Sequence, residues 1–585
     1  MPPTPNDGRL SPRTFWLAIG LMLAAHAGVA VDCARRVTVT HDEYWHLPVG
    51  LLNWKTGRFD FENLNPLLTR LCGALPLCFV GAKTGDYEAV DVDHGYEEAF
   101  LVANRDRYFA LFWLGRLPNV AFSVGIGAML ALWARRFRGD AAALLTVLMW
   151  SCSATALANA SLMTPDIGVT FFFLAVFYQL WNYAGQPTWR RAIFVGVLLG
   201  LAQLCKYTAV LLYPMGLVGW LVLSVWRTGQ SACEPPRNWK TQLAQGAAMG
   251  VISLVVLNAG YLFHGSGSSL KSYQFASQSM QRIQQQAGAL SDLPVPLPRD
   301  YLEGFDRQRQ IMEGRHPVYL NEVWSVSGFV SYFAMALVYK LSHAEQLLAL
   351  LTICFLLFPD GEKRDLRRQA FLWVPIVGLM IVASTSTMQL GLRYILPVIP
   401  FLFLFAGQAA IWLQRTRFPT RSVLVGLAIV GLPTTLRFHP HYLAYFNELA
   451  GGPENGRYHL LDSNLDWGQD LRDLKPYLDQ QGITDIGLAY YGTLPPSAVG
   501  IQFHLPPGRA PVPGWFAVSV NYVQGRPHIL RDPEGKPHVA GLDEFAYFRF
   551  FEPKAHIGYS INVYHLSEED VALWRNAVRR QSPFP

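Results

Sequence analysis

The run IGVTFFFLAVFYQLWNYA, residues 167–184, holds no charged residue in 18 positions. An α-helix of about 20 apolar residues spans the hydrocarbon core of a bilayer, so this run predicts a membrane-spanning helix. Similar runs recur as far as residue 437. Together they predict about eleven spans, at 14–31, 109–133, 141–161, 167–184, 192–207, 208–226, 243–263, 343–358, 370–387, 394–413 and 422–437. The expected fold class is therefore mostly α, a polytopic membrane helix bundle.

The composition of the chain fits this class and excludes several others. Of its 585 residues, 51% are hydrophobic and 15% are charged, and the mean hydropathy is +0.19. Soluble globular proteins carry roughly 25% charged residues. A cytosolic enzyme, a disordered regulator and a disulfide scaffold are therefore excluded. The net charge of +6 is small for this length, and we expect membrane lipids rather than nucleic acid as partners.

The positive charges predict which side of the membrane each loop faces. Short cytoplasmic loops carry an excess of Lys and Arg, and here such loops follow the second, fourth, sixth, eighth and tenth spans. Alternation then places the N-terminus in the cytoplasm, with the first span as an uncleaved anchor. Three long segments, 32–108, 264–342 and 438–585, lie outside. We expect an inner membrane protein of bacterial type.

Two domains follow from this layout. Residues 1–437 form a transmembrane domain with outer loops 32–108 and 264–342, and residues 438–585 form a soluble extracytoplasmic domain. Within the loops, 67–82 and 328–340 are apolar but too short or interrupted for spans, so both predict helices that lie in the membrane interface.

The patterns in residues 438–585 predict a small α/β unit. The run DLRDLKPYLDQQ has the spacing of an amphipathic helix. Strand-like runs follow at 484–492, 514–520 and 561–566, and a last helix opens at Ser567. Asp466 and Gln469 have the spacing of a capping box, which predicts a helix that begins at Asp466.

The acids of the bundle lie at the outer ends of spans rather than at mid-membrane. An ion-coupled transporter usually carries acids inside its spans, so this pattern favours chemistry at a membrane surface. The sequence HDEYWH, residues 41–46, places Asp42 and Glu43 beside aromatic residues. Both carboxylates are candidates for a general base, and Tyr44 and His46 for contacts with a sugar or phosphate. The alternative is a solvated turn in which Asp42 caps a helix.

A third acid, Asp166, is expected on the same face of the membrane. It follows Thr164 and Pro165 where the third span emerges. Thr, Pro and Asp all favour the first turn of a helix, so capping is the competing interpretation. A divalent metal ion held by Asp42 and Asp166 is left open, because neither HExxH nor a zinc-type cysteine spacing occurs.

Basic residues are expected close to these acids. Lys206 in CKYT and Arg393 in GLRYILP lie near the outer ends of apolar helices. Each either reaches the lipid headgroups or holds a phosphate, for which the planar guanidinium of Arg is well suited. Arg70 and Arg116 offer the same choice.

Four stretches carry a resemblance to a known family. They are HDEYWHLPVGLLNWKTGRFDFENLNPLLTRLCGALP, LMTPDIGVTFFFLAVFY, GLAQLCKYTAVLLYP and GLRYILPVIPFLFLFAG. In this order they resemble glycosyltransferase family 39 of the GT-C fold, whose relatives include protein O-mannosyltransferases and the lipid A aminoarabinose transferase. The resemblance covers about 14–437. One departure is Asn65-Pro66-Leu67, where relatives usually carry a Pro-Pro pair after His, Lys or Asn.

The resemblance implies an activity and roles for the residues. The activity is inverting transfer of one sugar, a hexose or a pentose, from a polyprenyl-phosphate donor to a lipid, glycan or protein acceptor outside the cytoplasm. Asp42 or Glu43 would take the proton of the acceptor hydroxyl, and Asp166 would position the acceptor or a metal. Arg393 would bind the carrier phosphate, with Lys206 near it. These groups are expected to converge on one outward-opening cavity.

Two other functions compete with this hypothesis. A flippase or transporter of lipid-linked sugars would move the intact carrier across the bilayer without forming a glycosidic bond. A noncatalytic scaffold would depend on residues 438–585 and not on the acids.

Overall fold

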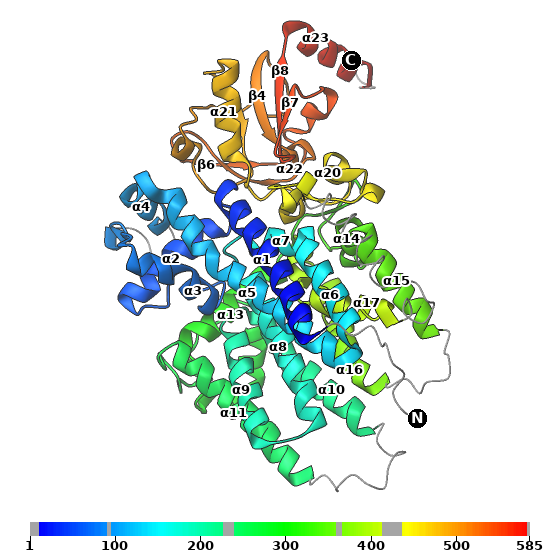
Figure 1. The fold of residues 1–585 in the computed structure, drawn as a ribbon. Coiled ribbons are helices and arrows are strands. Elements are labelled where there is room, and N and C mark those ends of the chain that lie inside the picture. The colour runs from blue at the N-terminus through cyan, green and yellow to red at the C-terminus, as the bar shows by residue number, and fades with distance from the viewer. Residues whose placement is uncertain (1–10, 90–94, 226–238, 358–365, 412–435, 582–585) are drawn as a thin grey trace.

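The computed structural model describes the chain apart from residues 1–10, 90–94, 226–238, 358–365, 412–435 and 582–585. Helices dominate the first three quarters of the chain (Figure 1). They are α1 (Pro12–Arg36), α2 (Glu43–Thr56), α3 (Leu68–Phe79), α4 (Tyr96–Ala103), α5 (Tyr108–Arg138), α6 (Asp140–Cys152), α7 (Ala154–Ala160), α8 (Pro165–Gly185), α9 (Trp189–Gln203), α10 (Leu212–Val225), α11 (Trp239–Gly260), α12 (Gln278–Ala287), α13 (Arg299–Glu313), α14 (Tyr332–Lys340), α15 (His343–Leu357), α16 (Leu366–Ser384) and α17 (Val398–Ala406).

Several of these helices have the length and composition of membrane spans. Within the described ranges, four are long and apolar enough: α1, the run 105–138 that contains α5, α8 and α11. The helices α6 and α7 meet the same criterion together, with a bend of 60° between them. Shorter apolar helices lie at 68–79, 207–222, 343–354, 369–384 and 398–411. The mostly helical bundle is confirmed; eleven spans stay a prediction, and the last, 422–437, lies almost wholly outside the described residues.

Two arginines at the end of α5, Arg135 and Arg138, show which helix ends lie together. The guanidinium carbon of Arg135, in the last turn of α5, lies 4.4 Å from the ring centroid of Phe15 at the start of α1. Arg138 donates to Gln408, just after α17, at 3.0 Å. The start of α1 therefore lies beside the end of α5, as alternating spans require. The side of the membrane that this end faces stays a prediction.

Both short apolar runs outside the spans form helices. Residues 68–79 of the first run form α3, and 332–340 of the second form α14. Between α13 and α14 the chain forms a small antiparallel hairpin of β1 (Val318–Leu320) and β2 (Val323–Ser325). Placement of α3 and α14 at a membrane interface stays a prediction.

A mixed four-stranded sheet forms the end of the molecule opposite α10 and α11 (Figure 1). Its order is β3-β4-β8-β7, with β3 parallel to β4 and the other pairs antiparallel. Strands lie within the predicted runs 514–520 and 561–566, and a shorter one, 487–489, within the run 484–492, but no helix begins at Asp466. A small α/β domain stays a prediction. The elements are α20 (Gly452–Asn455), α21 (Leu471–Gln481), β3 (Gly487–Ala489), β4 (Gly514–Ser519), α22 (Val520–Val523), β5 (His528–Arg531), β6 (Pro537–Ala540), β7 (Ala555–Ile557), β8 (Ile561–Leu566) and α23 (Glu568–Gln581).

The sheet region shares its hydrophobic core with the outer helices. One cluster joins Leu471 of α21 with Leu47 of α2 and Phe112 of α5. Another joins Trp467 with Ala30 of α1 and with α7. Burial of apolar surface is worth about 25 cal/mol per Å², so these clusters fix the region onto the bundle. A division of the chain into two domains at residue 437 stays a prediction.

The capping box predicted at Asp466 is wrong. No helix begins at Asp466, and the next helix, α21, starts five residues later at Leu471. Instead Asp466 Oδ1 accepts a hydrogen bond from Gly468 N at 3.1 Å. The Gln469 side chain accepts one from Trp467 N at 2.8 Å. The same side-chain to backbone bonds that cap helices also close loops, and here they shape a loop.

Candidate active site

Four charged side chains from distant parts of the sequence meet between the bundle and the sheet region. Arg393 Nη1 donates to Asp42 Oδ2 at 2.6 Å and lies 3.9 Å from Asp166 Oδ2. Lys206 Nζ donates to Asp166 Oδ1 at 2.6 Å. We call Asp42, Asp166, Lys206 and Arg393 the ion cluster. The structure brings Asp42 and Asp166 together with Arg393, as the sequence predicts.

Each member of the ion cluster lies at the end of a helix or in a turn. Asp42 lies in the turn between α1 and α2, and Asp166 is the second residue of α8. Lys206 lies directly before the 3₁₀ helix η3 (Tyr207–Leu211), and Arg393 lies within η6 (Leu392–Ile395). These positions place polar side chains where apolar helices end, so no ion is carried into the middle of a span.

The helix-capping interpretation of residues 164–166 is not supported. Thr164 stands at the N-cap of α8 but its side chain makes no cap hydrogen bond. Asp166 directs its carboxylate at Lys206 and Arg393 instead. Asp42 likewise precedes α2 without capping it.

The ion cluster is sheltered but retains unused polar atoms. The Asp166 side chain is fully buried, while those of Arg393, Lys206 and Asp42 are 12%, 16% and 25% exposed. Among the described residues, Asp166 Oδ2 and Arg393 Nε have no hydrogen-bond partner. Buried polar atoms in folded proteins are normally paired, so these two atoms mark a place for a polar ligand.

The charges in the ion cluster keep Asp42 ionised. Burial by itself would raise the pKa of Asp42, but the positive charge of Arg393 outweighs it, with help from His46 and His41. The resulting pKa is about 2. In the absence of substrate this carboxylate is therefore a partner of Arg393 and a poor proton acceptor.

Glu43, the neighbour of Asp42, faces a different partner. Its carboxylate is fully buried and accepts from Arg116 Nε and Nη2 at 2.7 and 2.6 Å. It also accepts from the backbone and hydroxyl of Thr40 and from Met163 N. With its lone pairs occupied in this way, Glu43 ties the turn that carries Asp42 to α5 and to the residues before α8. The structure does not bring Glu43 into the ion cluster.

His46 and Arg70 line a small pocket next to the ion cluster. The pocket is lined by His46, Asn65, Pro66, Thr69, Arg70, Met163 and Pro165. Arg70 Nη1 contacts Glu62 Oε2 at 3.1 Å, and His46 Nδ1 lies 3.5 Å from the same oxygen. Within the described part of the chain, His46 Nε2 and Arg70 Nε lack a hydrogen-bond partner. Both predicted residues therefore present unused donors or acceptors beside Asp42 and Asp166.

Tyr44 does not take the position predicted for it. Its side chain is buried in the hydrophobic cluster that contains Leu47, Leu77 and Tyr108. Helical geometry explains the difference, because Tyr44 and His46 lie two residues apart on α2 and so face different ways. Tyr44 belongs to the core of the outer helices and not to the ligand pocket.

One site residue was missed by sequence reasoning. Trp467 packs its ring over the guanidinium of Arg393, with the Arg carbon 4.1 Å from the ring centroid. It is 2% exposed. A signal was present in the sequence, since a Trp flanked by acids and Gly in a polar segment is unusual for a core position, but the capping-box pattern concealed it.

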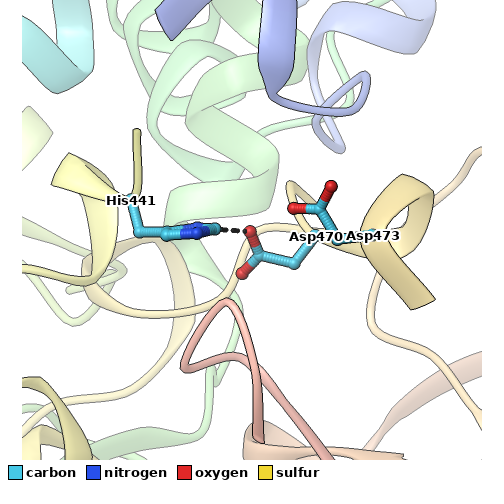
Figure 2. Close-up of side chains that lie close together, drawn as sticks. All are labelled: His441, Asp470 and Asp473. Carbon is cyan, nitrogen blue, oxygen red and sulfur yellow. Dashed lines mark hydrogen bonds and ion pairs between the residues drawn. The ribbon is translucent and has the colours of Figure 1, made fainter. Parts of the chain in front are cut away.

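The ion cluster is a poor site for a divalent metal ion. Asp42 and Asp166 are each paired with a cation, and no third His, Cys, Asp or Glu joins them in a metal-sized group among the described residues. Such a group does exist elsewhere, formed by His441, Asp470 and Asp473 (Figure 2). There His441 Nδ1 and Asp470 Oδ1 are 3.0 Å apart, within hydrogen-bond distance, and Ser560 donates to Asp470 Oδ2 at 2.7 Å. These bonds account for Asp470 without a metal, and Asp473 is exposed.

Fold and site together define an integral membrane protein whose polar site lies where apolar helices meet a sheet region. Residues 109–255 match the family model described as dolichyl-phosphate-mannose-protein mannosyltransferase. This match confirms the resemblance to glycosyltransferase family 39. No curated protein matches the chain.

Two solved structures are similar to the chain along most of its length. One is ArnT from Cupriavidus metallidurans bound to undecaprenyl phosphate, with 14% identity and a TM-score of 0.46, covering 93% of this chain and 97% of that one. The other is the oligosaccharyltransferase AglB from Archaeoglobus fulgidus in complex with an inhibitory peptide and a dolichol-phosphate. It has 10% identity and a TM-score of 0.46, with 90% and 74% covered. Sequence identities and TM-scores this low give no evidence about function.

Proposed function

We propose that the protein is a membrane glycosyltransferase. It moves a single sugar, a hexose or a pentose, from a polyprenyl-phosphate donor to an acceptor hydroxyl outside the cytoplasm. The observation that carries this proposal is the ion cluster: two carboxylates and two cations joined by three contacts of 2.6–3.9 Å at the ends of apolar helices. The family match over 109–255, to a model described as dolichyl-phosphate-mannose-protein mannosyltransferase, supports it.

The two cations of the ion cluster bind the carrier phosphate. Arg393 retains an unpaired Nε, and its planar fork matches a phosphate. Lys206 adds a second positive charge on the other side of Asp166. As the bond between sugar and phosphate breaks, negative charge builds on the departing oxygen, and fixed cations in a sheltered site stabilise that charge.

Asp42 serves as the general base once phosphate has taken its partner. With Arg393 bound to it, the pKa of Asp42 is about 2, which is too low for efficient proton removal. A phosphate that takes over the guanidinium removes the charge that lowers this pKa, so substrate binding activates the base. The partial exposure of Asp42, 25%, lets an acceptor hydroxyl reach it.

The transfer is a single displacement. The acceptor oxygen attacks the anomeric carbon, its proton passes to Asp42, and the carbon–oxygen bond to phosphate breaks with its electron pair on the phosphate. Because attack and departure occur on opposite faces, the anomeric configuration inverts. We assign to His46 and Arg70 a contact with one sugar hydroxyl, since each keeps an unpaired nitrogen at a small pocket that Pro165 also lines.

The remaining acids act on the geometry of the site. Asp166 holds Lys206 and Arg393 at fixed positions, and Glu43 anchors the Asp42 turn through Arg116. We assign no metal to the reaction, because Lys206 and Arg393 already provide the positive charge that a divalent ion would bring. The site faces the outside of a bacterial-type inner membrane in this proposal, and residues 438–585 form the soluble domain above it.

The test is product analysis in membranes that contain the protein. A polyprenyl-phosphate donor with a labelled sugar is supplied together with candidate acceptors, and mass spectrometry follows the label. A new glycosidic bond of inverted configuration that depends on Asp42 supports the proposal. Label that crosses the bilayer on an intact carrier, with no new bond in any acceptor fraction, would instead establish a flippase.

A further inference from the structure

A single loop from the sheet region contacts two of the turns that carry the ion cluster, those of Asp42 and Arg393. The loop is DSNLDWGQD, residues 462–470, and we call it the bracing loop. On one side it accepts hydrogen bonds from the turn of Asp42: Trp467 O accepts from His41 N at 3.0 Å and Gln469 O from Thr38 N at 2.8 Å. The carbonyls of Trp467 and Gln469 thus hold the stretch from Thr38 to His41, directly before Asp42.

On the other side the bracing loop holds the turn of Arg393. Asn464 Oδ1 accepts from Leu392 N at 3.0 Å, and Ser463 Oγ donates to Leu390 O at 2.5 Å. Gly391, between these two contacts, has φ +152°, and a Cβ there would collide with the Ser463 side chain. The turn can therefore approach the loop only because glycine occupies this position.

The bracing loop is itself anchored on the sheet region. Asn521, at the start of α22, accepts from Asp462 N at 2.8 Å and donates to Asp466 O at 3.0 Å. Ser519, the last residue of β4, donates to the Asp466 carboxylate. A rigid strand end thus holds the loop at two points four residues apart.

The most direct contact of the bracing loop with the ion cluster is the Trp467 ring. It lies over the guanidinium of Arg393 at 4.1 Å and belongs to the hydrophobic cluster of α1 and α7. A cation held over a Trp face is attracted by about 0.5–2 kcal/mol, and more strongly when water is excluded. The ring therefore fixes the plane of the guanidinium while leaving its Nε without a hydrogen-bond partner among the described residues.

We propose that Trp467 is a positioning residue of this site, and that the bracing loop makes the sheet region a working part of it. The ring orients the fork of Arg393 for phosphate, while the loop backbone sets the distance between the turns of Asp42 and Arg393. This inference rests on the proposed function for the identity of the ligand, a polyprenyl phosphate. It accounts for why so polar a loop is buried against the bundle.

A double-mutant cycle tests the positioning role. Trp467→Leu and Arg393→Lys are made singly and together, and each protein is assayed for kcat, for KM and for inhibition by polyprenyl phosphate. We expect Trp467→Leu to lower kcat and weaken this inhibition about tenfold. If the ring acts through Arg393, the double variant is little worse than Arg393→Lys alone. Losses that multiply would overturn the proposal.

Two further variants separate positioning from folding. Trp467→Phe keeps an aromatic face and is expected to retain most of the inhibition by polyprenyl phosphate; a loss as large as that of Trp467→Leu contradicts the proposal. Trp515→Leu makes the same change in β4, where the ring packs on His565 rather than on Arg393, and should leave the phosphate response unchanged.

Different results refute the glycosyltransferase activity and the positioning role of Trp467. A wild-type protein that forms no glycosidic bond refutes the function. Protection against thermal unfolding by polyprenyl phosphate remains measurable in that case. If this protection is present in the wild type and is equally strong in Trp467→Leu, the positioning role is refuted whatever the enzyme does.

Discussion

Arg393 Nη1 lies 2.6 Å from Asp42 Oδ2, although 351 residues separate them in the chain. The pair is built from two turns, each at the end of an apolar helix, and one loop of the sheet region touches both. A carboxylate and a guanidinium in such contact neutralise each other. An anionic ligand that competes for the guanidinium therefore changes the chemistry of the carboxylate as well.

The first prediction concerns the base. Asp42→Asn removes the proton acceptor but keeps the shape, and general-base catalysis contributes roughly 10²–10⁴-fold. We expect kcat to fall by that order with a much smaller change in the KM for the donor, measured with a radiolabelled donor in membranes. Asp60→Asn is the matched control, because Asp60 is exposed and forms an ion pair with Arg58 at the surface. Equal activity of the two variants would remove Asp42 from the mechanism.

The second prediction concerns the phosphate site. Lys206→Met removes the nearer cation of the buried Asp166, which keeps only the longer contact with Arg393 at 3.9 Å. Weakening a buried ion pair from one side costs up to about 3 kcal/mol of stability. We expect a lower melting temperature and a raised KM for the donor.

Adding Asp166→Asn to this variant separates the two effects. The double variant has no buried unpaired charge, so the melting temperature should recover while the KM stays high. Recovery of both would show that Lys206 serves only to neutralise Asp166.

The helices and the acids of the site follow from the sequence for a physical reason. Alternating spans bring every second helix end to the same side of the membrane. The predicted spans therefore place Asp42, Asp166, Lys206 and Arg393 on one membrane face. On that face, attraction between opposite charges favours pairing of the acids with the basic residues.

Other features were beyond sequence reasoning. Asp42 and Glu43 are adjacent, and only the packing of Arg116 decides which of them faces the ligand. Trp467 reaches Arg393 through a loop whose residues have the spacing of a helix cap. The hydrogen bonds that shape the bracing loop join neighbouring residues, so the sequence carries a signal for them. The contacts of the loop with the turns of Asp42 and Arg393 join distant segments, for which the sequence carries no such signal.

The third prediction separates Glu43 from its neighbour. Breaking a buried ion pair from one side costs about 3–5 kcal/mol, so Glu43→Gln should lower the melting temperature strongly by releasing Arg116. Asp42→Asn, in the half-open site, should lower it much less. Glu303→Gln, which breaks an exposed pair with Arg299, serves as the control and should cost roughly 0.3–0.5 kcal/mol. A Glu43→Gln protein as stable as the wild type would mean that the carboxylate is not needed for the turn.

The fourth prediction is a pH dependence of stability. Burial raises the pKa of Asp466 well above its usual range. The folded protein thus binds a proton that the unfolded chain releases near pH 4. Stability from this group is therefore complete below that pH and is lost as the pH rises toward the folded pKa.

Replacing Asp466 by Asn should reduce this dependence, because the amide cannot ionise. Melting temperatures at pH 5 and pH 8 provide the measurement, and the difference between them should be smaller in Asp466→Asn than in the wild type. The exposed Asp479→Asn should leave the difference as it is. An identical pH response of wild type and Asp466→Asn would show that this group does not titrate differently on folding.

The last prediction concerns metal ions. In the ion cluster each carboxylate already has a cationic partner, Arg393 for Asp42 and Lys206 for Asp166, so we expect transfer to persist after dialysis against EDTA. Activity is assayed before dialysis, after it, and after Mg²⁺ or Mn²⁺ is restored. His441→Ala is assayed in parallel, because His441 belongs to the one metal-sized group found among the described residues. Loss with EDTA in the wild type but not in His441→Ala would place a functional metal at that group, whereas equal loss in both would return the metal to Asp42 and Asp166 and contradict the charge argument made for them.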